Sequence, residues 1–191
     1  MERFSKMKPK SDITEPKDEV LYEDEHTQLI KYDDWTILKG SDAVVCIPYL
    51  IEENKIILRN EYVPPFKYVD NKDHFLTLVS GTIETGETPK DTLIRELEEE
   101  AGIVLREDYN EFEEFAPLFM VKSCTGKYHP FIIPLHERDY HEKIALGDGS
   151  KAEKLSNSVK IDIKYLKSLL PSDLITDYML YKLKEYIKIV K

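Results

Sequence analysis

The sequence predicts an α+β fold in which helices pack on a mixed β-sheet. Two observations lead to this prediction. Short β-branched and apolar runs dominate the first half of the chain, and they return after a single charged helix near its middle. The chain then ends in amphipathic helical patterns. Strands, one helix, further strands and terminal helices in this order are typical of an α+β domain.

The N-terminal region is predicted to contain an arm followed by strands. Residues 1–20 alternate charged residues with Pro and Ser, so we expect a flexible arm without a signal peptide. Residues 21–191 are predicted to form a single domain, which includes an N-terminal β extension over about 21–40. Within this extension, the segments QLIKY and WTILKG flank Asp33 and Asp34 and predict a β-hairpin.

Further strands are predicted where β-branched and apolar residues cluster. These runs cover residues 43–50, 55–63, 74–81, 115–124 and 131–136. A loop is predicted at the Pro-containing segment 64–73. A second, polar loop is predicted at 137–158, whose length is typical of a lid or binding loop.

The C-terminal segment predicts helices that pack on the sheet. Pro171 and Ser172 interrupt the pattern, and a long amphipathic helix follows. A stripe at near-helical spacing is predicted to face the core. It consists of Leu174, Tyr178, Tyr181, Leu183 and Ile187.

The composition excludes several classes of function. The 191 residues are 41% hydrophobic and 34% charged, which suits one soluble globular domain. The formal net charge of −10 argues against long nucleic acid as a partner, because that needs a basic surface. No apolar run reaches the roughly 18 residues that span a bilayer, so no membrane partner is expected. Cys46 and Cys124 are expected to be buried thiols in a cytoplasmic protein.

The charged helix near the middle of the chain is predicted over residues 88–102. Thr88 is a favourable N-cap, and Pro89 suits the first helical position. Asp91 lies where an acidic residue stabilises the helix N-terminus. Gly102 stands where a left-handed residue usually ends a helix.

The glutamates of this helix fall on two different flanks. At about 100° per residue, one side of the helix is apolar and can pack on the sheet. This side consists of Leu93, Ile94, Leu97 and Ala101. Glu96, Glu99 and Glu100 cluster on one flank, whereas Glu98 falls on the other. Converging carboxylates suit Mg²⁺, Mn²⁺ or Ca²⁺, although a short Glu-rich run can also be a solvated helix face.

Residues around the helix can support such a metal site. Arg95 and Glu87 form a charge pair that can orient the carboxylates. Gly81 and Gly86 allow sharp backbone turns, so a carbonyl near Gly81 can face the metal. Because Mg²⁺ is commonly shared with substrate phosphates, phosphate chemistry is the expected activity.

The segment from residue 81 to residue 103 resembles the Nudix box, Gly-x5-Glu-x7-Arg-Glu-U-x-Glu-Glu-x-Gly-U, in which U is apolar. All the specified positions match, at Gly81, Glu87, Arg95, Glu96, Leu97, Glu99, Glu100, Gly102 and Ile103. The order of strands and helices is also similar to that of the family's α/β/α sandwich. The resemblance implies a Mg²⁺- or Mn²⁺-dependent hydrolase of nucleoside diphosphates linked to another moiety.

The resemblance also implies roles for the box residues. Glu96 and Glu100 would be the principal metal ligands, and Glu99 a further ligand or an activator of water. The carbonyl of Gly81, or of Ser80 beside it, would complete the coordination. Arg95 would orient the glutamates. Glu87 would pair with that arginine or hold a water of an outer metal.

The layout is most similar to that of ADP-ribose pyrophosphatases. In those enzymes the strand before the box typically ends in Arg-Gln-Tyr-Arg, whereas here it reads Arg59-Asn60-Glu61-Tyr62. Arg59 could hold a substrate phosphate or form a surface ion pair. Lys127 could contact a phosphate or be an ordinary exposed turn residue.

The catalytic base is left open by the sequence. ADP-ribose pyrophosphatases commonly carry a glutamate in a loop after the box, and the corresponding residues 123–129 contain no acid. A box glutamate could serve instead, as could Glu137, Asp139 or Glu142 in the following loop.

The expected function is hydrolysis of a pyrophosphate linkage in a nucleoside diphosphate derivative, with ADP-ribose or a nucleoside diphosphate sugar first. Dinucleoside polyphosphates and NADH are alternative substrates. A non-catalytic Nudix-fold nucleotide sensor is a further alternative, as is a chance match on an acidic helix of a structural protein. The expected partner is a small nucleotide. The N-terminal hairpin resembles the element by which ADP-ribose pyrophosphatases dimerise, so a homodimer is possible.

Overall fold

The computed structural model describes residues 18–24, 27–147, 149–171 and 173–190. Contacts divide the chain into two compact units. The first unit comprises Met1–Gly40 and Val121–Thr125, and the second comprises Ser41–Met120 and Gly126–Lys191. The predicted β extension thus forms a unit with a later segment of the chain.

The first unit is a three-stranded antiparallel sheet. Its strands are β1 (Glu19–Glu23), β2 (Gln28–Tyr32) and β3 (Trp35–Lys39). The predicted hairpin is confirmed, with Asp33 in the left-handed conformation at its turn (φ 54°). Strand β1 begins inside the segment predicted as a flexible arm, and most of that arm lies outside the described residues.

The second unit is built on a mixed sheet with the strand order β10-β11-β4-β5-β13. These strands are β4 (Ala43–Leu50), β5 (Lys55–Glu61), β10 (Leu118–Phe119), β11 (Lys127–Leu135) and β13 (Asn157–Asp162). Strands β4 and β11 pair in parallel, whereas the other pairs are antiparallel.

Short strands extend this sheet or stand beside it. Strand β6 (Phe75–Thr77) pairs with β5, and β7 (Val79–Thr82) pairs with β4. Strand β9 (Glu113–Glu114) pairs with β11. A separate pair is formed by β8 (Ile103–Leu105) and β12 (Tyr140–Glu142).

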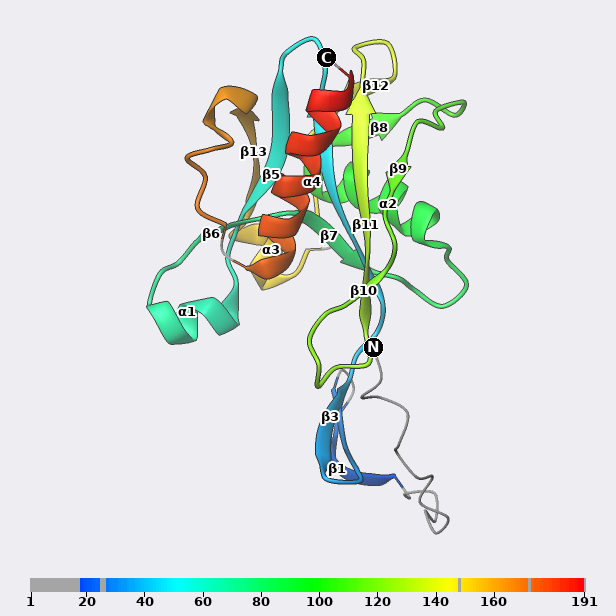
Figure 1. Cartoon of the computed structure of the whole chain (residues 1–191), viewed down its shortest axis with the longest axis vertical. Coiled ribbons are helices and arrows are strands. Elements are labelled where there is room, and N and C mark those ends of the chain that lie inside the picture. The colour runs from blue at the N-terminus through cyan, green and yellow to red at the C-terminus, as the bar shows by residue number, and fades with distance from the viewer. Residues whose placement is uncertain (1–17, 25–26, 148, 172, 191) are drawn as a thin grey trace, which may run out of the picture. The chain divides into compact units, whose positions relative to one another are not determined.

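Helices cover both faces of the mixed sheet. Helix α2 (Pro89–Ala101) lies behind the sheet in Figure 1, and α4 (Leu174–Val190) lies in front of it. Alternate residues of β4 enter two separate cores: Cys46 packs in the core of α2, and Ile47 packs in the core of α4. Because both faces are covered, every residue of β4 is buried. The predicted α+β fold, a sandwich with a mixed sheet, is confirmed.

The segment 64–73, predicted as a loop, contains helix α1 (Pro64–Asp70). Pro64 and Pro65 occupy the first helical turn, where proline is compatible with a helix. Asn71 ends the helix in a left-handed conformation (φ 56°). The prolines therefore begin a helix here instead of preventing one.

Two other segments also differ from the prediction. The predicted loop 137–158 contains β12, a short helix α3 (Lys151–Lys154) and the start of β13. Conversely, only β10 lies within the predicted strand 115–124. Strand β13 pairs along β5, a long-range contact that a polar local sequence does not reveal.

The C-terminal region contains a 3₁₀ turn, η1 (Ile163–Tyr165), before α4. The buried face of α4 comprises Thr176, Met179, Leu180 and Leu183. Leu174 is 83% exposed and Tyr181 is 58% exposed, so both were wrongly predicted to face the core. These two residues are seven positions apart and share the solvent side of the helix.

The cysteines lie in the core, and the helices can be compared with the length of a membrane span. Cys46 and Cys124 are both buried, as predicted. In the part of the chain that the structure describes, no helix combines the length and apolar character that crossing a membrane requires.

Candidate active site

Helix α2 begins with a capping box that fixes its first turn. The Thr88 hydroxyl accepts a hydrogen bond from the Asp91 N–H (3.3 Å), and Asp91 accepts one from the Thr88 N–H (2.9 Å). Gly102 ends the helix in a left-handed conformation (φ 66°). Both predicted ends of the helix are confirmed, so the angular positions of its side chains are set by regular helix geometry.

Arg95 connects three carboxylates. Its Nη1 donates to Glu96 (2.6 Å) and to Glu99 (3.1 Å). Its Nε and Nη2 donate to the two oxygens of Glu87 (3.1 and 3.2 Å). The fork of the guanidinium thus holds a loop acid and two helix acids in one arrangement.

Glu87 is held firmly before the helix begins. Besides Arg95, the Thr92 hydroxyl (2.7 Å) and the Glu84 N–H (3.2 Å) donate to its carboxylate. These donors, with Arg95 the largest influence, lower the pKa of Glu87 to about 2. Glu87 therefore remains an anion that fixes Arg95.

Glu96 lies against the backbone of Gly81 in β7. A Cβ atom at position 81 would overlap the Glu96 carboxylate, so only glycine permits this approach. Glu96 is 7% exposed, and burial raises its pKa to about 7, although Arg95 opposes this shift. The carboxylate and the Gly81 backbone thus adjoin, as the sequence predicted.

Glu100 is the second buried acid of the helix. It is 8% exposed, and burial raises its pKa to about 8 against the opposing charge of Arg59. The Ser80 N–H donates to its Oε2 (3.0 Å), and Arg59 Nε lies 3.5 Å from its Oε1. A buried carboxylate with a raised pKa readily exchanges its proton for a metal ion.

Arg59 is buried, so one of its two expected roles, a surface ion pair, does not fit, while contact with a substrate phosphate stays a prediction. It is 4% exposed, and its Nη1 donates to the Glu100 carbonyl (3.0 Å) at the end of α2. The prediction of a surface ion pair is therefore wrong, and Arg59 contacts both the backbone carbonyl and the carboxylate of Glu100. Its side chain contacts the helix rather than the open cavity, and its Nε has no hydrogen-bond partner among the described residues.

The two outer glutamates differ as the helical wheel predicted. Glu99 faces Arg95, together with Glu96. Glu98 points to the other flank, where it pairs with Lys143 of the following loop. Ile94, however, is exposed, so the apolar side of the helix is narrower than expected.

Glu96, Glu99 and Glu100 border a cavity of about 320 Å³. Its lining also contains two acids that the sequence did not single out, Glu84 and, on helix α3, Glu153. Ser150 caps this short helix by accepting from the Glu153 N–H (3.1 Å). Glu153 lies close enough to Glu96 for its charge to raise the Glu96 pKa. The cavity thus lies between the glutamates of α2 and the carboxylate of Glu153 on α3.

Comparisons with known proteins agree with this arrangement. The NUDIX domain model matches residues 41–157 of the chain. This chain belongs to the NUDIX domain family. The crystal structure of an ADP compounds hydrolase shares the fold with a TM-score of 0.64 at 16% identity, covering 93% of this chain and 96% of that one. No curated protein sequence matches the chain.

The chain is a Nudix hydrolase. The positions of Glu137, Asp139 and Glu142 make these loop acids less suitable for catalysis. Asp139 accepts from the His136 N–H, and Glu142 pairs with Lys160. Neither of them lines the cavity of the box glutamates, and neither does Glu137. The sequence could have suggested Glu153 only by its place in the polar loop after the box.

Lys127 also lies outside the lining of the Nudix cavity. It begins β11, where its N–H donates to Asp42 (2.9 Å) and its Nζ lies 5.1 Å from the centre of the Phe119 ring. A role in phosphate binding stays a prediction for this lysine.

Nudix hydrolases generally need divalent metal ions, and the residues around the cavity fit one. In the described residues, no three acidic, His or Cys side chains converge as a finished metal site, because Arg95 engages Glu96 and Glu99. The donors are nevertheless all oxygens, and two of the carboxylates are buried, Glu96 beside the Gly81 backbone and Glu100 beside the Ser80 N–H. Such a set is appropriate for Mg²⁺ or Mn²⁺.

Proposed function

We propose that this Nudix hydrolase cleaves the pyrophosphate linkage of a nucleoside diphosphate derivative with the aid of Mg²⁺ or Mn²⁺. ADP-ribose and nucleoside diphosphate sugars are the first candidates. The observation that carries the proposal is the cavity that Glu96, Glu99, Glu100 and Glu153 line together with Arg95. The likeness in fold to an ADP compounds hydrolase supports the choice of substrate class.

The acids would share the chemistry as follows. Glu96 and Glu100 would hold the metal, with Glu99 as a further ligand and the carbonyl of Gly81 or Ser80 nearby. Bound metal would neutralise the charge that develops on the phosphate oxygens. Arg95 and Glu87 would keep the carboxylates oriented.

Glu153 is the residue best placed to activate the attacking water. It reaches the cavity from α3 and not from α2, so it can face a substrate whose phosphates would be held through metal at the helix acids. A carboxylate there can accept the proton of a water molecule as the oxygen attacks phosphorus. Glu99 is the alternative base within the helix.

A substrate panel tests the function. Wild-type protein with Mg²⁺ or Mn²⁺ should release product from ADP-ribose or a nucleoside diphosphate sugar faster than from dinucleoside polyphosphates or NADH. A preference for either of the latter would reassign the substrate. Tight nucleotide binding without hydrolysis of any panel member would favour a sensor instead.

A second experiment tests the base. Glu153→Gln should lower kcat by about 10² to 10⁴, the usual contribution of a general base, while Mn²⁺ affinity stays near that of wild type. Glu137→Gln and Glu142→Gln are matched controls from the same polar segment and should keep normal turnover. Normal turnover in Glu153→Gln, with a loss in Glu99→Gln, would move the role to the helix.

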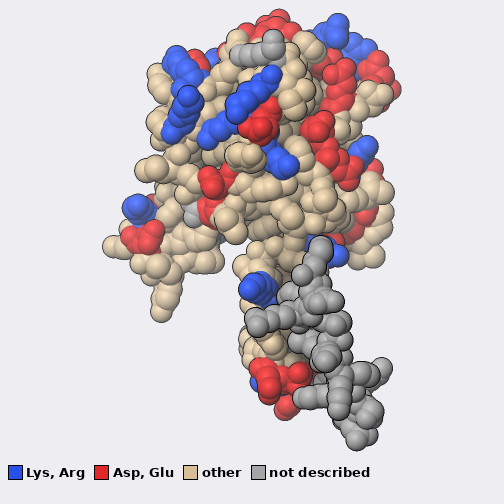
Figure 2. All heavy atoms as spheres, viewed as in Figure 1, with Lys and Arg blue, Asp and Glu red and all other residues tan. Residues whose placement is uncertain are grey.

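The binding partner, the oligomeric state and the cellular location of the enzyme stay predictions. On the face shown in Figure 2, Lys and Arg side chains are interleaved with Asp and Glu, which supports a small nucleotide rather than long nucleic acid as partner. We also keep the expectations of a homodimer and of a cytoplasmic location. Analytical ultracentrifugation tests the first, and fractionation of cells tests the second.

A further inference from the structure

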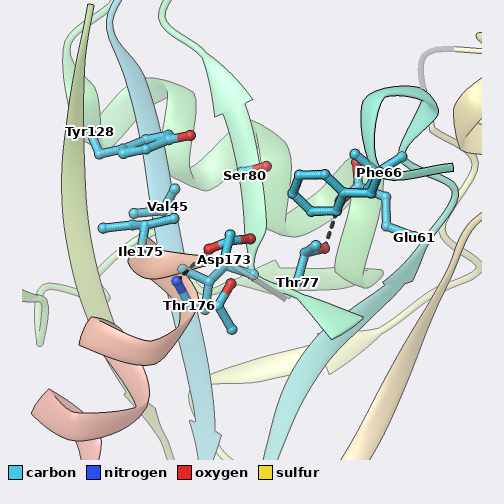
Figure 3. Close-up of a pocket in the computed structure, with 11 residues that line it drawn as sticks. Val45, Glu61, Phe66, Thr77, Ser80, Tyr128, Asp173, Ile175 and Thr176 are labelled. Carbon is cyan, nitrogen blue, oxygen red and sulfur yellow. Dashed lines mark hydrogen bonds between the residues drawn. The ribbon is translucent and has the colours of Figure 1, made fainter. Parts of the chain in front are cut away.

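A second pocket borders the carboxylate cavity (Figure 3). It has a volume of about 200 Å³. Ser80 lines both spaces, and its N–H donates to Glu100 of the cavity. The two spaces are therefore neighbours that share Ser80 as a wall. Complete ligand sites usually measure about 300–1,000 Å³, so the pocket fits one portion of a larger ligand.

The charged groups of this pocket can only accept hydrogen bonds when ionised. Its described lining contains the carboxylates of Glu61 and Asp173, and it contains no Lys, Arg or His. A phosphate would therefore meet negative charge without a cation to balance it. The pocket suits an uncharged group that donates hydrogen bonds.

Both carboxylates are held in place and retain acceptor capacity. The Thr77 hydroxyl donates to Glu61 Oε2 (2.6 Å), and the Thr176 N–H donates to Asp173 Oδ1 (2.7 Å). Among the described residues, neither Glu61 Oε1 nor Asp173 Oδ2 receives a hydrogen bond. Each carboxylate thus has one fixed oxygen and one that a ligand can use.

A buried hydroxyl in the same lining also lacks a partner. Thr176 is fully buried, and its Oγ1 has no hydrogen bond within the described part of the chain. Buried polar groups are nearly always hydrogen-bonded in native proteins, so an unsatisfied one calls for an explanation. A bound polar ligand or water at this wall would supply the missing bond.

The remaining walls are apolar and partly aromatic. Figure 3 shows Phe66 and Tyr128 on opposite sides of the pocket, with Asp173 and Thr77 between them in this view. Val45 and Ile175 add aliphatic surface. A sugar ring matches this combination, because its C–H faces are apolar while its adjacent hydroxyls donate. Carboxylates commonly bind ribose hydroxyls in nucleotide sites.

We propose that this pocket is the subsite for a ribose ring joined to the reacting phosphates, with Glu61 and Asp173 accepting hydrogen bonds from its vicinal hydroxyls. The proposal rests on the proposed function, which places the phosphates at the carboxylate cavity. It names two specificity residues outside the Nudix box.

The test compares two non-hydrolysable probes by calorimetry in the presence of Mg²⁺. One probe is α,β-methylene ADP-ribose, and the other is the same molecule without the 2- and 3-hydroxyls of both riboses. The variants are Glu61→Ala and Asp173→Ser. Serine is a good helix N-cap, so the second variant shortens the side chain while preserving the start of α4. Asp177→Ser, an exposed acid one turn further along α4, is the matched control.

Wild type and the control should bind the hydroxylated probe at least about tenfold more tightly, as expected for hydrogen bonds to charged groups. Both variants should lose this preference while they still fold cooperatively and still bind Mn²⁺. An equal loss for the two probes, an unchanged preference, or loss of Mn²⁺ binding would overturn the proposal. So would failure of wild type to bind the hydroxylated probe.

Failure of the proposed function gives a different result. If wild type hydrolyses no substrate of the panel but still distinguishes the two probes through Glu61 and Asp173, the subsite stands and the activity does not. If it hydrolyses ADP-ribose but the variants keep the preference for the hydroxylated probe, the activity stands and the subsite is overturned.

Discussion

Glu98 and Glu100 are two residues apart on α2, yet their surroundings are opposite. Glu98 is partly exposed and pairs with Lys143, whereas Glu100 is buried against Ser80 and Arg59. An exposed ion pair contributes about 0–1 kcal/mol to the free energy of unfolding. A buried acid at a metal site instead contributes directly to ligand binding.

This difference predicts different results for two single substitutions. Glu98→Gln should leave Mn²⁺ affinity and turnover near wild type, because that side chain points away from the cavity. Glu100→Gln should abolish Mn²⁺ binding and turnover. Titration with Mn²⁺ followed by electron paramagnetic resonance, together with kcat, measures both effects. Equal behaviour of the two variants would contradict the division of the helix into two flanks.

Arg95 allows a second prediction about a single residue. Lysine at this position keeps the charge but cannot bond Glu87, Glu96 and Glu99 with one planar fork. Arg95→Lys should therefore lower metal affinity or turnover by about 10- to 100-fold, as is usual when a partner of metal ligands is lost. Arg106→Lys is a control, since within the described residues the Arg106 side chain pairs with exposed Asp108. Wild-type kinetics in Arg95→Lys would show that the fork is dispensable.

The residues predicted correctly are those that local geometry determines. Once α2 is a helix, the spacing of its glutamates places Glu99 beside Arg95 and Glu98 on the other flank. Arg59 and Glu153 reach the site from elsewhere in the chain. The first lies on β5 and the second on a short helix within a polar loop. Their positions depend on long-range pairing, which one sequence does not reveal.

Among the elements, α2 depends most clearly on a local signal. Its capping box satisfies N–H groups that have no partner inside the helix. Thr88→Ala should lower the free energy of unfolding by about 1 kcal/mol, whereas Thr88→Ser should preserve it. Urea denaturation followed by circular dichroism measures the difference. Equal losses in both variants would mean that the methyl group, and not the hydroxyl, stabilises the first turn.

Elements were predicted well where the signal lies within the element itself. The apolar run of β4 and the caps of α2 are such signals. Helix α1 was missed because its prolines suggest a loop as readily as a first helical turn. Strand β13 was missed because its residues are only half buried and gain their strand structure by pairing with β5.

For the whole molecule, the buried acids of the site make the free energy of unfolding depend on pH. The pKa values of Glu96 and Glu100 are raised to about 7 and about 8 by burial, above the usual value of 4.5. A raised carboxyl pKa means that the folded state binds the proton more tightly than the unfolded state. The resulting stabilisation is fully present below about pH 4.5 and is lost as the pH rises through 7 and 8.

Glu87 behaves in the opposite sense, and its effect falls in another pH range. Its pKa is lowered to about 2 from 4.5, chiefly by Arg95. Its contribution to stability is therefore present above about pH 4.5 and is lost as the pH falls toward 2. The interval between pH 5 and pH 8 consequently reports on Glu96 and Glu100 with little contribution from Glu87.

The metal-free protein should therefore become less stable from pH 5 to pH 8, and the double variant Glu96→Gln, Glu100→Gln should show a flatter profile. Each unit of pKa shift corresponds to about 1.4 kcal/mol, so urea denaturation at several pH values in a chelator can resolve the difference.

Excess Mn²⁺ should reverse the dependence of stability on pH in wild type, because metal competes with protons for the same carboxylates. The Glu98→Gln variant should follow wild type throughout. Parallel profiles for wild type and the double variant would show that these two buried acids do not couple pH to the stability of the molecule.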